Sequence, residues 1–214
     1  MSLFDAFKPK WQHSNPAKRL KAVNEMDESN QDTLERVAST DSDVTVRTAA
    51  VKKLTAISAL QSISKNDSDE NIRKLAGNRY LEETVKKLKN LTDASSEDLT
   101  LLNDLKDTHY AEDLLKSPNT CDAIRAELVK CCKKASVLAN VAMRDASEAI
   151  AIAAAQKVES DTLMADIVKS SKHVSVRKLV SDKIRAKKEV EDGGKKAAAL
   201  EASKREALLG QAHH

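Results

Sequence analysis

The sequence has few aromatic residues, few glycines and few prolines. Phe, Trp and Tyr make up 2% of its 214 residues, and it contains only 4 Gly and 3 Pro. A single compact domain of this length would bury more aromatic rings, whereas thin layers between helices can be filled with Leu, Val, Ile and Ala. The scarcity of Gly and Pro, with abundant Ala, Lys, Leu and Glu, predicts an all-α fold. So few glycines also exclude, in practice, a glycine-rich phosphate loop.

Cysteine and long apolar runs are scarce as well. The three cysteines, Cys121, Cys131 and Cys132, are an odd and clustered set, which excludes a disulfide framework. They lack the CxxC spacing of a zinc site, so we interpret them as buried, small apolar thiols. No stretch approaches the roughly 18 apolar residues of a membrane span, and residues 1–8 contain no signal-peptide core. We therefore expect a cytosolic protein without a membrane segment.

The net charge of +3 is distributed unevenly. Residues 1–168 hold 24 Lys and Arg against 27 Asp and Glu, a net of −3, and residues 169–214 hold 12 against 6, a net of +6. The C-terminal end therefore predicts, as an alternative function, weak and salt-sensitive binding of nucleic acid. The cations concerned are Lys169, Lys172, Arg177, Lys178, Lys183, Arg185, Lys187 and Lys188.

A short phrase centred on arginine recurs about every 26 residues. It occupies residues 16–23, 44–51, 70–77, 122–129 and 174–180, with arginine at Arg19, Arg47, Arg73, Arg125 and Arg177. Arginine is missing at two intermediate positions, Leu99 and Ala151. A fixed period of this size is typical of solenoids, whose stacked units present long surfaces to partners.

Aspartate accompanies the arginine. Asp41 precedes Arg47 by six residues, and Asp67 precedes Arg73 by six. We expect a ladder in which each arginine reaches the aspartate of its own or the next unit, because charge-assisted bonds fix stacking register. The predicted ladder residues are Asp41, Arg47, Asp67, Arg73, Arg125 and Arg177. Two alternatives stay open: a basic groove for an acidic peptide or nucleic acid, and a chance preference of arginine for helices.

Apolar residues spaced by three and four predict a helix pair in each unit. Residues 14–16 are a helix start, and capping boxes are expected at Asp67 with Glu70 and at Ser95 with Asp98. Gly193–Gly194 predicts a break or hinge in the C-terminal helical segment, because each glycine costs a helix about 1 kcal/mol relative to alanine.

Three domains are expected. Residues 1–13 form an N-terminal cap in which Phe4, Phe7 and Trp11 cover the first helix pair; a platform that stacks a ligand is the alternative. Residues 14–185 form the repeat array. Residues 186–214 form a charged helical tail, either the start of a coiled coil or a partly disordered segment, and His213 and His214 fit the stub of a purification tag.

The helix-pair unit, its Val-Arg start and the Asp–Arg spacing resemble HEAT-like repeats over residues 14–185. Residues 7–23 are similar to the N-terminus of a bacterial family of uncharacterised proteins in which HEAT-like repeats precede a long charged coiled coil. The resemblance implies a right-handed α-solenoid of six or seven HEAT-like helix pairs with a charged C-terminal helix. It also implies binding or scaffolding, with no activity to transfer.

The motifs of catalysis are missing. The sequence contains no HExxH and no Ser or Cys nucleophile motif, and His13, His109 and His173 are far apart. We therefore expect no enzyme activity, metal, cofactor or small-molecule substrate, and predict a scaffold for an unknown protein partner. The second helices of such arrays usually line the concave face, which makes five residues candidate contacts: Arg36, Gln61, Lys65, Asn140 and Asp166.

Overall fold

The computed structural model describes the backbone of residues 8–211 and the side chains of residues 8–205. Within this range the chain forms twelve α-helices and two short 3-10 helices, and no strand. The predicted all-α class is confirmed for these residues. Phe4, Phe7, His213 and His214 lie outside the described residues.

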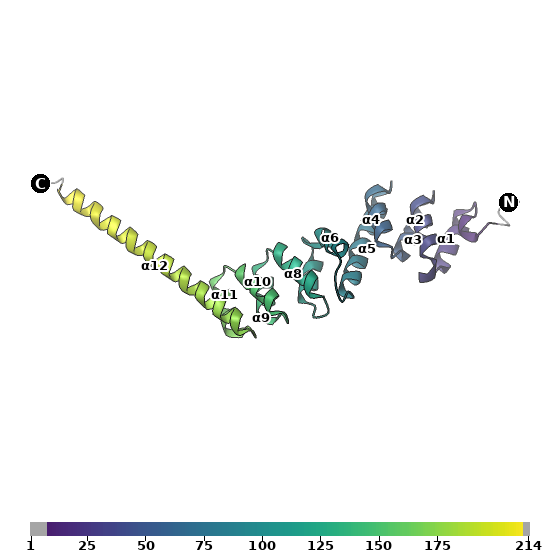
Figure 1. Cartoon of the computed structure of the whole chain (residues 1–214). Coiled ribbons are helices and arrows are strands. Elements are labelled where there is room, and N and C mark those ends of the chain that lie inside the picture. Colours follow the sequence, from purple (N-terminus) through teal and green to yellow (C-terminus); the bar gives the residue numbers. More distant parts are fainter. Residues whose placement is uncertain (1–7, 212–214) are drawn as a thin grey trace. The chain divides into compact units, whose positions relative to one another are not determined.

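The chain divides into two compact units (Figure 1). Unit 1 comprises the residues up to Leu91 together with Asn103–Leu105, and unit 2 comprises Thr92–Leu102 and the residues from Lys106 onward. The helices of unit 1 are η2 (Lys10–Gln12), α1 (Pro16–Glu25), η3 (Glu28–Asn30), α2 (Gln31–Thr40), α3 (Val44–Lys53), α4 (Ile57–Asn66) and α5 (Glu70–Lys89). The helices of unit 2 are α6 (Ser96–Leu105, with its last three residues counted in unit 1), α7 (His109–Lys116), α8 (Asp122–Cys131), α9 (Ala135–Arg144), α10 (Glu148–Gln156), α11 (Asp161–Ser170) and α12 (Val174–Gln211).

Helices in each unit pack on their near neighbours in the sequence. In unit 1, α1 and α2 pack on α3, and α3 and α4 pack on α5. In unit 2, α7 packs on α8 and α9, α10 packs on α8, α9 and α12, and α11 packs on α9 and α12. In both units a second helix therefore packs on the first helix of the following pair, and successive first helices pack on each other.

Aliphatic side chains fill the layers between these helices. In unit 1 the fully buried set includes Val23, Leu34, Val51, Leu54, Leu60 and Ile72, and in unit 2 it includes Ile124, Leu128, Ala151, Ala154, Met164 and Ile167. Tyr80 is the one buried aromatic side chain among the described residues, and Trp11 packs against the edge of the unit 1 core. Small and branched side chains thus supply the burial that the aromatic-poor composition predicts.

Most helix starts follow the predicted chemistry. The Asn15 side chain accepts the backbone N–H of Ala17 at the start of α1, and Ser95 and Asp98 form the expected capping box. The capping box expected at Asp67 is wrong. Asp69 caps α5 instead, accepting from the amides of Asn71 and Ile72, because Asp67 is engaged by an arginine.

Two elements depart from the pattern of short pairs. Helix α5 is continuous over 20 residues, so the third repeat is not split into a pair. Helix α12 is continuous over 38 residues and passes through Gly193–Gly194, so the predicted break is wrong. Both glycines are exposed, and good helix formers flank them on both sides. The helical hydrogen bonds on either side therefore outweigh a cost of about 1 kcal/mol per glycine.

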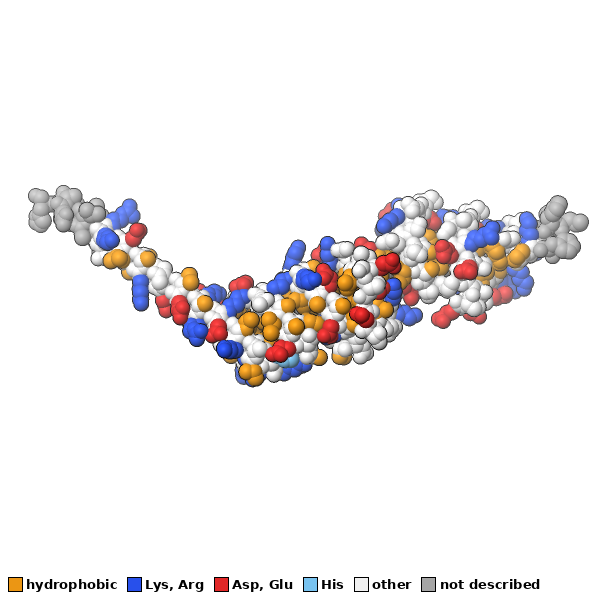
Figure 2. Space-filling view, viewed as in Figure 1, with side chains coloured by type: hydrophobic (Ala, Val, Ile, Leu, Met, Phe, Trp, Pro, Cys, Tyr) orange, Lys and Arg blue, Asp and Glu red, His pale blue; other side chains and the backbone are white. Residues whose placement is uncertain are grey.

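The outer part of α12 carries no buried side chain. Every residue from Lys188 to Arg205 is exposed, including Val190 at 75% and Leu200 at 58%. Figure 2 shows cationic and anionic side chains interspersed along this helix, with few hydrophobic ones. Among the described residues, no helix is both long enough and apolar enough to cross a bilayer.

Replacing Gly193 and Gly194 by alanine is expected to stabilise the outer part of α12. A Cβ at either position meets nothing within 4 Å, and each change removes about 0.5–1 kcal/mol of helix cost. Amide exchange at residues 188–205 should slow in the double variant. Gly77→Ala on α5, where the added Cβ would be in ordinary contact with Ser64 at 3.8 Å, is the control and should leave exchange in α12 unchanged. Unchanged exchange in the double variant would contradict the continuous helix.

Candidate functional site

The recurring arginines bind aspartates between successive helix pairs. Arg19 of α1 donates from Nε to Asp41 Oδ2 at 2.7 Å and from Nη2 to Asp41 Oδ1 at 2.8 Å. Arg47 of α3 repeats this with Asp67, at 3.0 and 3.1 Å. Its third donor, Nη1, bonds the carbonyl of Asp41 at 2.9 Å. Each arginine therefore joins the start of its own helix to the start of the next pair. We call this arrangement an Arg–Asp joint.

Unit 2 contains the same Arg–Asp joint. Arg125 of α8 donates to both carboxylate oxygens of Asp145, at 2.9 and 3.2 Å. A further bond goes to Asp122 at 2.7 Å, and Nη1 donates to the carbonyl of Thr120. Arg47 and Arg125 are only 8% and 5% exposed. Occupied and buried guanidinium groups cannot line a basic groove, which removes that alternative at these two positions.

The aspartates of the joints also organise the turn that follows them. Asp41 Oδ1 accepts the amide of Asp43 at 2.9 Å, and Asp67 Oδ1 accepts that of Asp69 at 2.8 Å. Burial by itself would raise the pKa of Asp41, but the hydrogen bonds from Arg19 and the Asp43 amide outweigh it and hold the pKa below its ordinary value. The same balance lowers the pKa of Asp67, with Arg47 as the partner.

Two predicted ladder arginines form no ion pair with aspartate among the described contacts. Arg73 donates to the backbone carbonyls of Asp67 and Ser68, at 2.7 and 3.2 Å, and Arg177 donates to the carbonyl of Ser171. The prediction that each arginine reaches a carboxylate is wrong at these two positions. Each guanidinium still links its helix to the preceding turn, because it donates to a backbone carbonyl there.

Positions without arginine also lack the aspartate. Arginine and aspartate of a joint are 20 residues apart in the pairs Arg47–Asp67 and Arg125–Asp145. Twenty residues after Leu99 stands Asn119, and twenty after Ala151 stands Ser171. At these two positions of the repeat, the arginine and its expected aspartate are therefore both absent.

At Ala151, Ser171 and His173 make the contacts between the repeats. Ser171 Oγ donates to the carbonyl of Ala142 at 2.9 Å, and His173 Nε2 lies 2.9 Å from the carbonyl of Asp145. In the joints of Arg19 and Arg47, Nη1 bonds the equivalent carbonyl, six residues before the arginine. His173 therefore takes over one arginine contact, which sequence reasoning did not foresee.

A second set of cations, which sequence reasoning missed, binds the ends of the first helices. Lys53 Nζ donates to the carbonyls of Asn24 and Met26, at 2.6 and 2.7 Å, where α1 ends. Lys157 does the same at the end of α8, and Lys183 does so at the end of α10. Arg79 bonds the carbonyl of Leu54 at 3.1 Å, where α3 ends. Helix ends leave carbonyls unpaired and carry partial negative charge, so a cation is stabilising there. We call these four residues the turn cations.

The turn cations share the 26-residue register. Lys53 and Arg79 are 26 residues apart, Lys157 and Lys183 are 26 apart, and Arg79 precedes Lys157 by three times 26. This spacing was visible in the sequence. The intermediate positions hold Leu105 and Cys131 instead.

Two of the five candidate partner contacts are engaged inside the molecule. The guanidinium carbon of Arg36 lies 5.3 Å from the centroid of the Trp11 ring, a cation–π contact. Gln61 Nε2 donates to Tyr80 Oη at 3.2 Å and to Asp104 Oδ2 at 3.3 Å. Tyr80 itself donates to Asp104 at 2.6 Å. Burial, followed by this bond to Asp104, raises the pKa of Tyr80 to about 12, so the phenol stays protonated.

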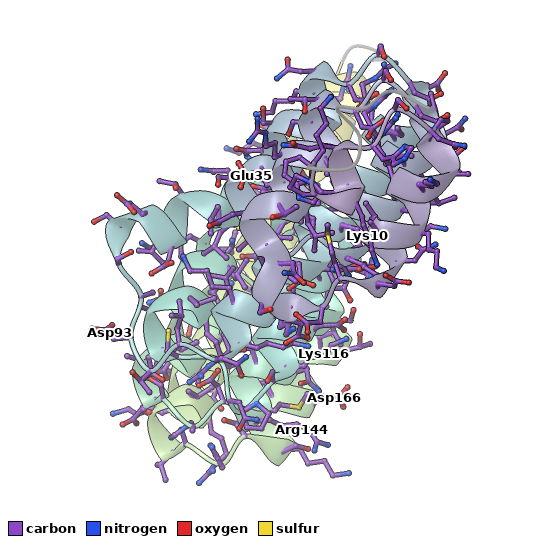
Figure 3. All side chains as sticks on the ribbon, turned by 90° about the vertical axis from the view of Figure 1, so that its right-hand side faces the viewer. Lys10, Glu35, Asp93, Lys116, Arg144 and Asp166 are labelled. Carbon is purple, nitrogen blue, oxygen red and sulfur yellow. The ribbon has the colours of Figure 1, made fainter. Side chains whose placement is uncertain are left out.

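The other three candidates stand on separate second helices. Lys65 on α4 and Asp166 on α11 are exposed, and Asn140 on α9 is half-buried. Figure 3 shows Asp166 at the outside of its helix, as it also shows Glu35 on α2. Three of the five candidates, Arg36, Gln61 and Lys65, therefore lie in unit 1, and Asn140 and Asp166 lie in unit 2.

The basic C-terminal end is partly neutralised by carboxylates. Lys183 pairs with Glu159 at 2.6 Å, Arg185 with Asp182 at 2.8 Å, and Lys187 with Asp161 at 2.6 Å. Arg177 is bound to a backbone carbonyl. Half of the eight cations predicted for nucleic-acid binding thus have partners within unit 2.

The cysteines and histidines form no metal site in the described part of the chain. No group of three or more His, Cys, Asp or Glu side chains is arranged to hold a metal ion there. All three cysteines are unbridged and half-buried, which corrects the prediction of fully buried thiols. Burial raises the pKa of the Cys131 thiol, so this group is neutral at pH 7.

Comparisons with protein-family models, with curated proteins and with solved structures gave no match.

Removing one side of an Arg–Asp joint is expected to destabilise unit 1. Arg47→Ala leaves Asp67 nearly buried without its partner, which lowers the free energy of unfolding by about 3 kcal/mol. Lys65→Ala, at an exposed position, is the matched control and should change it by less than about 0.5 kcal/mol. Urea denaturation measures both. Equal effects of the two substitutions would contradict a structural role for the joint.

The joints also predict acid sensitivity. Because the folded-state pKa values of Asp41 and Asp67 lie below the ordinary value of 3.8, their stabilisation is complete above that value and is lost as pH falls through the folded-state values. The melting temperature of the wild type should therefore fall more steeply below about pH 4 than that of an Asp41→Asn/Asp67→Asn variant. Melting curves at pH 7, 5 and 3 check this. A stability gap that stays constant over this range would count against it.

Proposed function

We propose that the chain is a non-catalytic scaffold for a protein partner, with each unit built as a stack of HEAT-like helix pairs. The observation that carries the proposal is the register of the two cation sets. Arg–Asp joints bind the start of one pair to the next, and turn cations bind the end of each first helix. The turn cations recur at multiples of 26 residues. The joint arginines recur at 28 residues from Arg19 to Arg47 and at three times 26 from Arg47 to Arg125, as expected for a stack of like units.

The charges of these joints are used inside the molecule, which leaves the exposed faces of the helices for recognition. Second helices present Arg36, Lys65 and Asp166 at their surfaces. Such a surface is mixed in charge, so it suits a polar protein segment recognised by several spaced contacts. We infer that the partner binds along successive second helices of a unit.

The scaffold proposal is tested with matched charge reversals in unit 1. Arg36→Glu/Lys65→Glu alters the second helices α2 and α4, and Lys21→Glu/Lys52→Glu alters the first helices α1 and α3. All four residues are exposed, and both variants change the net charge by the same amount. Partners captured from the native host by the wild type should be lost with the first variant and retained with the second. Retention of the same partners by both variants, with folding shown by circular dichroism, would reject recognition through the second helices.

A further inference from the structure

The turn cations share one way of capping a helix end. For each of α1, α3, α8 and α10, the helix ends and a Lys or Arg from the next pair donates to carbonyls of the turn. Lys183 shows the full set of contacts: the carbonyls of Gln156 and Val158 at 2.8 and 2.9 Å and the carboxylate of Glu159 at 2.6 Å. Arg79, Lys157 and Lys183 each donate to a carbonyl 25 residues earlier, and Lys183 alone of the four also pairs with a carboxylate 24 residues earlier.

The pattern explains why one register position needs no cation. Leu105 stands where a turn cation would be expected, and the residues it would serve lie in the middle of α5. Helix α5 continues there, so its carbonyls are already paired within the helix. A fully buried leucine is compatible with this position.

The position of Cys131 is different, because α6 does end at the corresponding place. Helix α6 ends at Leu105, with Lys106 as its C-cap. The residues 25 and 24 positions before Cys131 are Lys106 and Asp107. The register therefore assigns the carbonyl of Lys106 to a cation at residue 131, and Asp107 stands where Lys183 finds the carboxylate of Glu159. Cys131 is too short and uncharged, and its thiol donates to Leu128 of its own helix at 3.4 Å.

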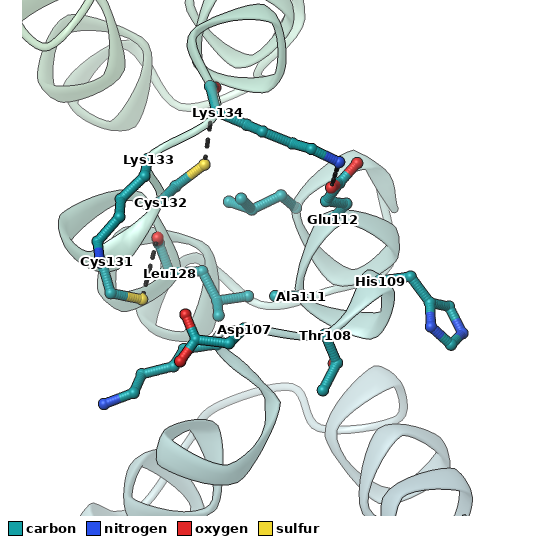
Figure 4. A pocket seen from close by; sticks show the side chains of 12 residues that line it. Asp107, Thr108, His109, Ala111, Glu112, Leu128, Cys131, Cys132, Lys133 and Lys134 are labelled. Atoms are coloured by element: carbon teal, nitrogen blue, oxygen red, sulfur yellow. Dashed lines mark hydrogen bonds and ion pairs between the residues drawn. The ribbon is translucent and has the colours of Figure 1, made fainter.

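A cavity of about 280 Å³ lies at this place in unit 2 (Figure 4). Lys106, Asp107 and Cys131 all line it, together with the apolar side chains of Ala111, Leu115 and Leu128. Its other charged lining residues are Glu112, Lys134 and the exposed Lys133. Figure 4 shows Asp107 on the Cys131 side of the cavity, and the ion pair of Lys134 with Glu112 on another side. Lys134 is thereby held by Glu112, and no described contact engages the Asp107 carboxylate.

We propose that this cavity binds a primary ammonium group on an aliphatic stem. The ammonium would occupy the place that a turn cation fills at the other helix ends, on the Lys106 carbonyl and the Asp107 carboxylate. The stem would lie along Ala111, Leu115 and Leu128, as lysine stems cover apolar surface elsewhere. Such a group is carried by a free diamine or by a lysine side chain, and the experiment separates the two sources.

Binding is tested on the full chain by ¹H–¹⁵N NMR at pH 7. The probes are 1,5-diaminopentane for the free amine and N-acetyl-lysine methylamide for the side chain. 1-Pentanol and tetramethylammonium are the controls, because neither combines an aliphatic stem with ammonium hydrogens. Amides of residues 107–112 and 131–134 should shift with at least one amine and with neither control. A response to the diamine alone identifies a free amine as ligand, and a response to the lysine derivative identifies a side chain. No response to either amine, or an equal response to pentanol, would overturn the proposal.

Substitutions of Cys131 and Asp107 test whether amine binding depends on the missing turn cation at residue 131. Cys131→Lys supplies the missing cation, so it should abolish the amine-induced shifts and raise the melting temperature by about 2–4 °C. Cys131→Ser keeps the position vacant and should bind amines as the wild type does. Asp107→Asn, at an exposed position, should weaken amine binding about tenfold through loss of a charge-assisted bond and remains informative if Cys131→Lys fails to fold. Wild-type binding by Cys131→Lys or by Asp107→Asn would refute the assignment. The scaffold proposal does not depend on this cavity.

Discussion

The bidentate bond between an arginine at the start of one helix pair and an aspartate at the start of the next is the constraint on which the described packing depends. The layers between helices are filled by Val, Leu, Ile and Ala, and such contacts are non-directional. Aliphatic layers alone would tolerate sliding of one helix along another. Two parallel hydrogen bonds from a planar guanidinium fix both distance and orientation. The Asp41 and Asp67 carboxylates, which also accept an amide of the following turn, pass this register on to the next helix.

The cost of an unpaired charge explains where the joint is absent. Asp145 is 8% exposed and Arg125 is 5% exposed, so loss of either residue alone would leave a nearly buried ion without a partner. At Ala151 the chain carries neither charge, and Ser171 and His173 bond the carbonyls that remain. Replacing both partners by neutral groups avoids the desolvation penalty of a lone charge. The absence of both charges at Ala151 therefore agrees with the cost of burying one charge without its partner.

The sequence predicted the class of fold, the helix starts at Asn15 and Ser95, and the Arg–Asp joints, because both members of each joint are polar residues at fixed spacing. It did not predict the contacts of the turn cations, since lysine is common on helix surfaces and its partners here are backbone carbonyls, which have no side-chain signature. The Gly193–Gly194 prediction was wrong because a propensity of about 1 kcal/mol is small beside the cooperativity of a long helix. Asp67 was assigned as a cap from local spacing alone, whereas its partner lies 20 residues away.

Because the turn cations recur at a fixed spacing, a position of this register without a cation needs a structural explanation. The 26-residue register places a cation at the ends of α1, α3, α8 and α10, and it tolerates Leu105 where α5 does not end. Cys131 is the one position of this register, among the described first-helix ends, where a first helix ends and the side chain is uncharged. A purely structural role would favour lysine there, as at Lys157 one unit later. The cavity lined by Asp107 and Leu128 is the physical consequence of that substitution, and a chain that retains it gives up the stabilisation that its own lysine would provide.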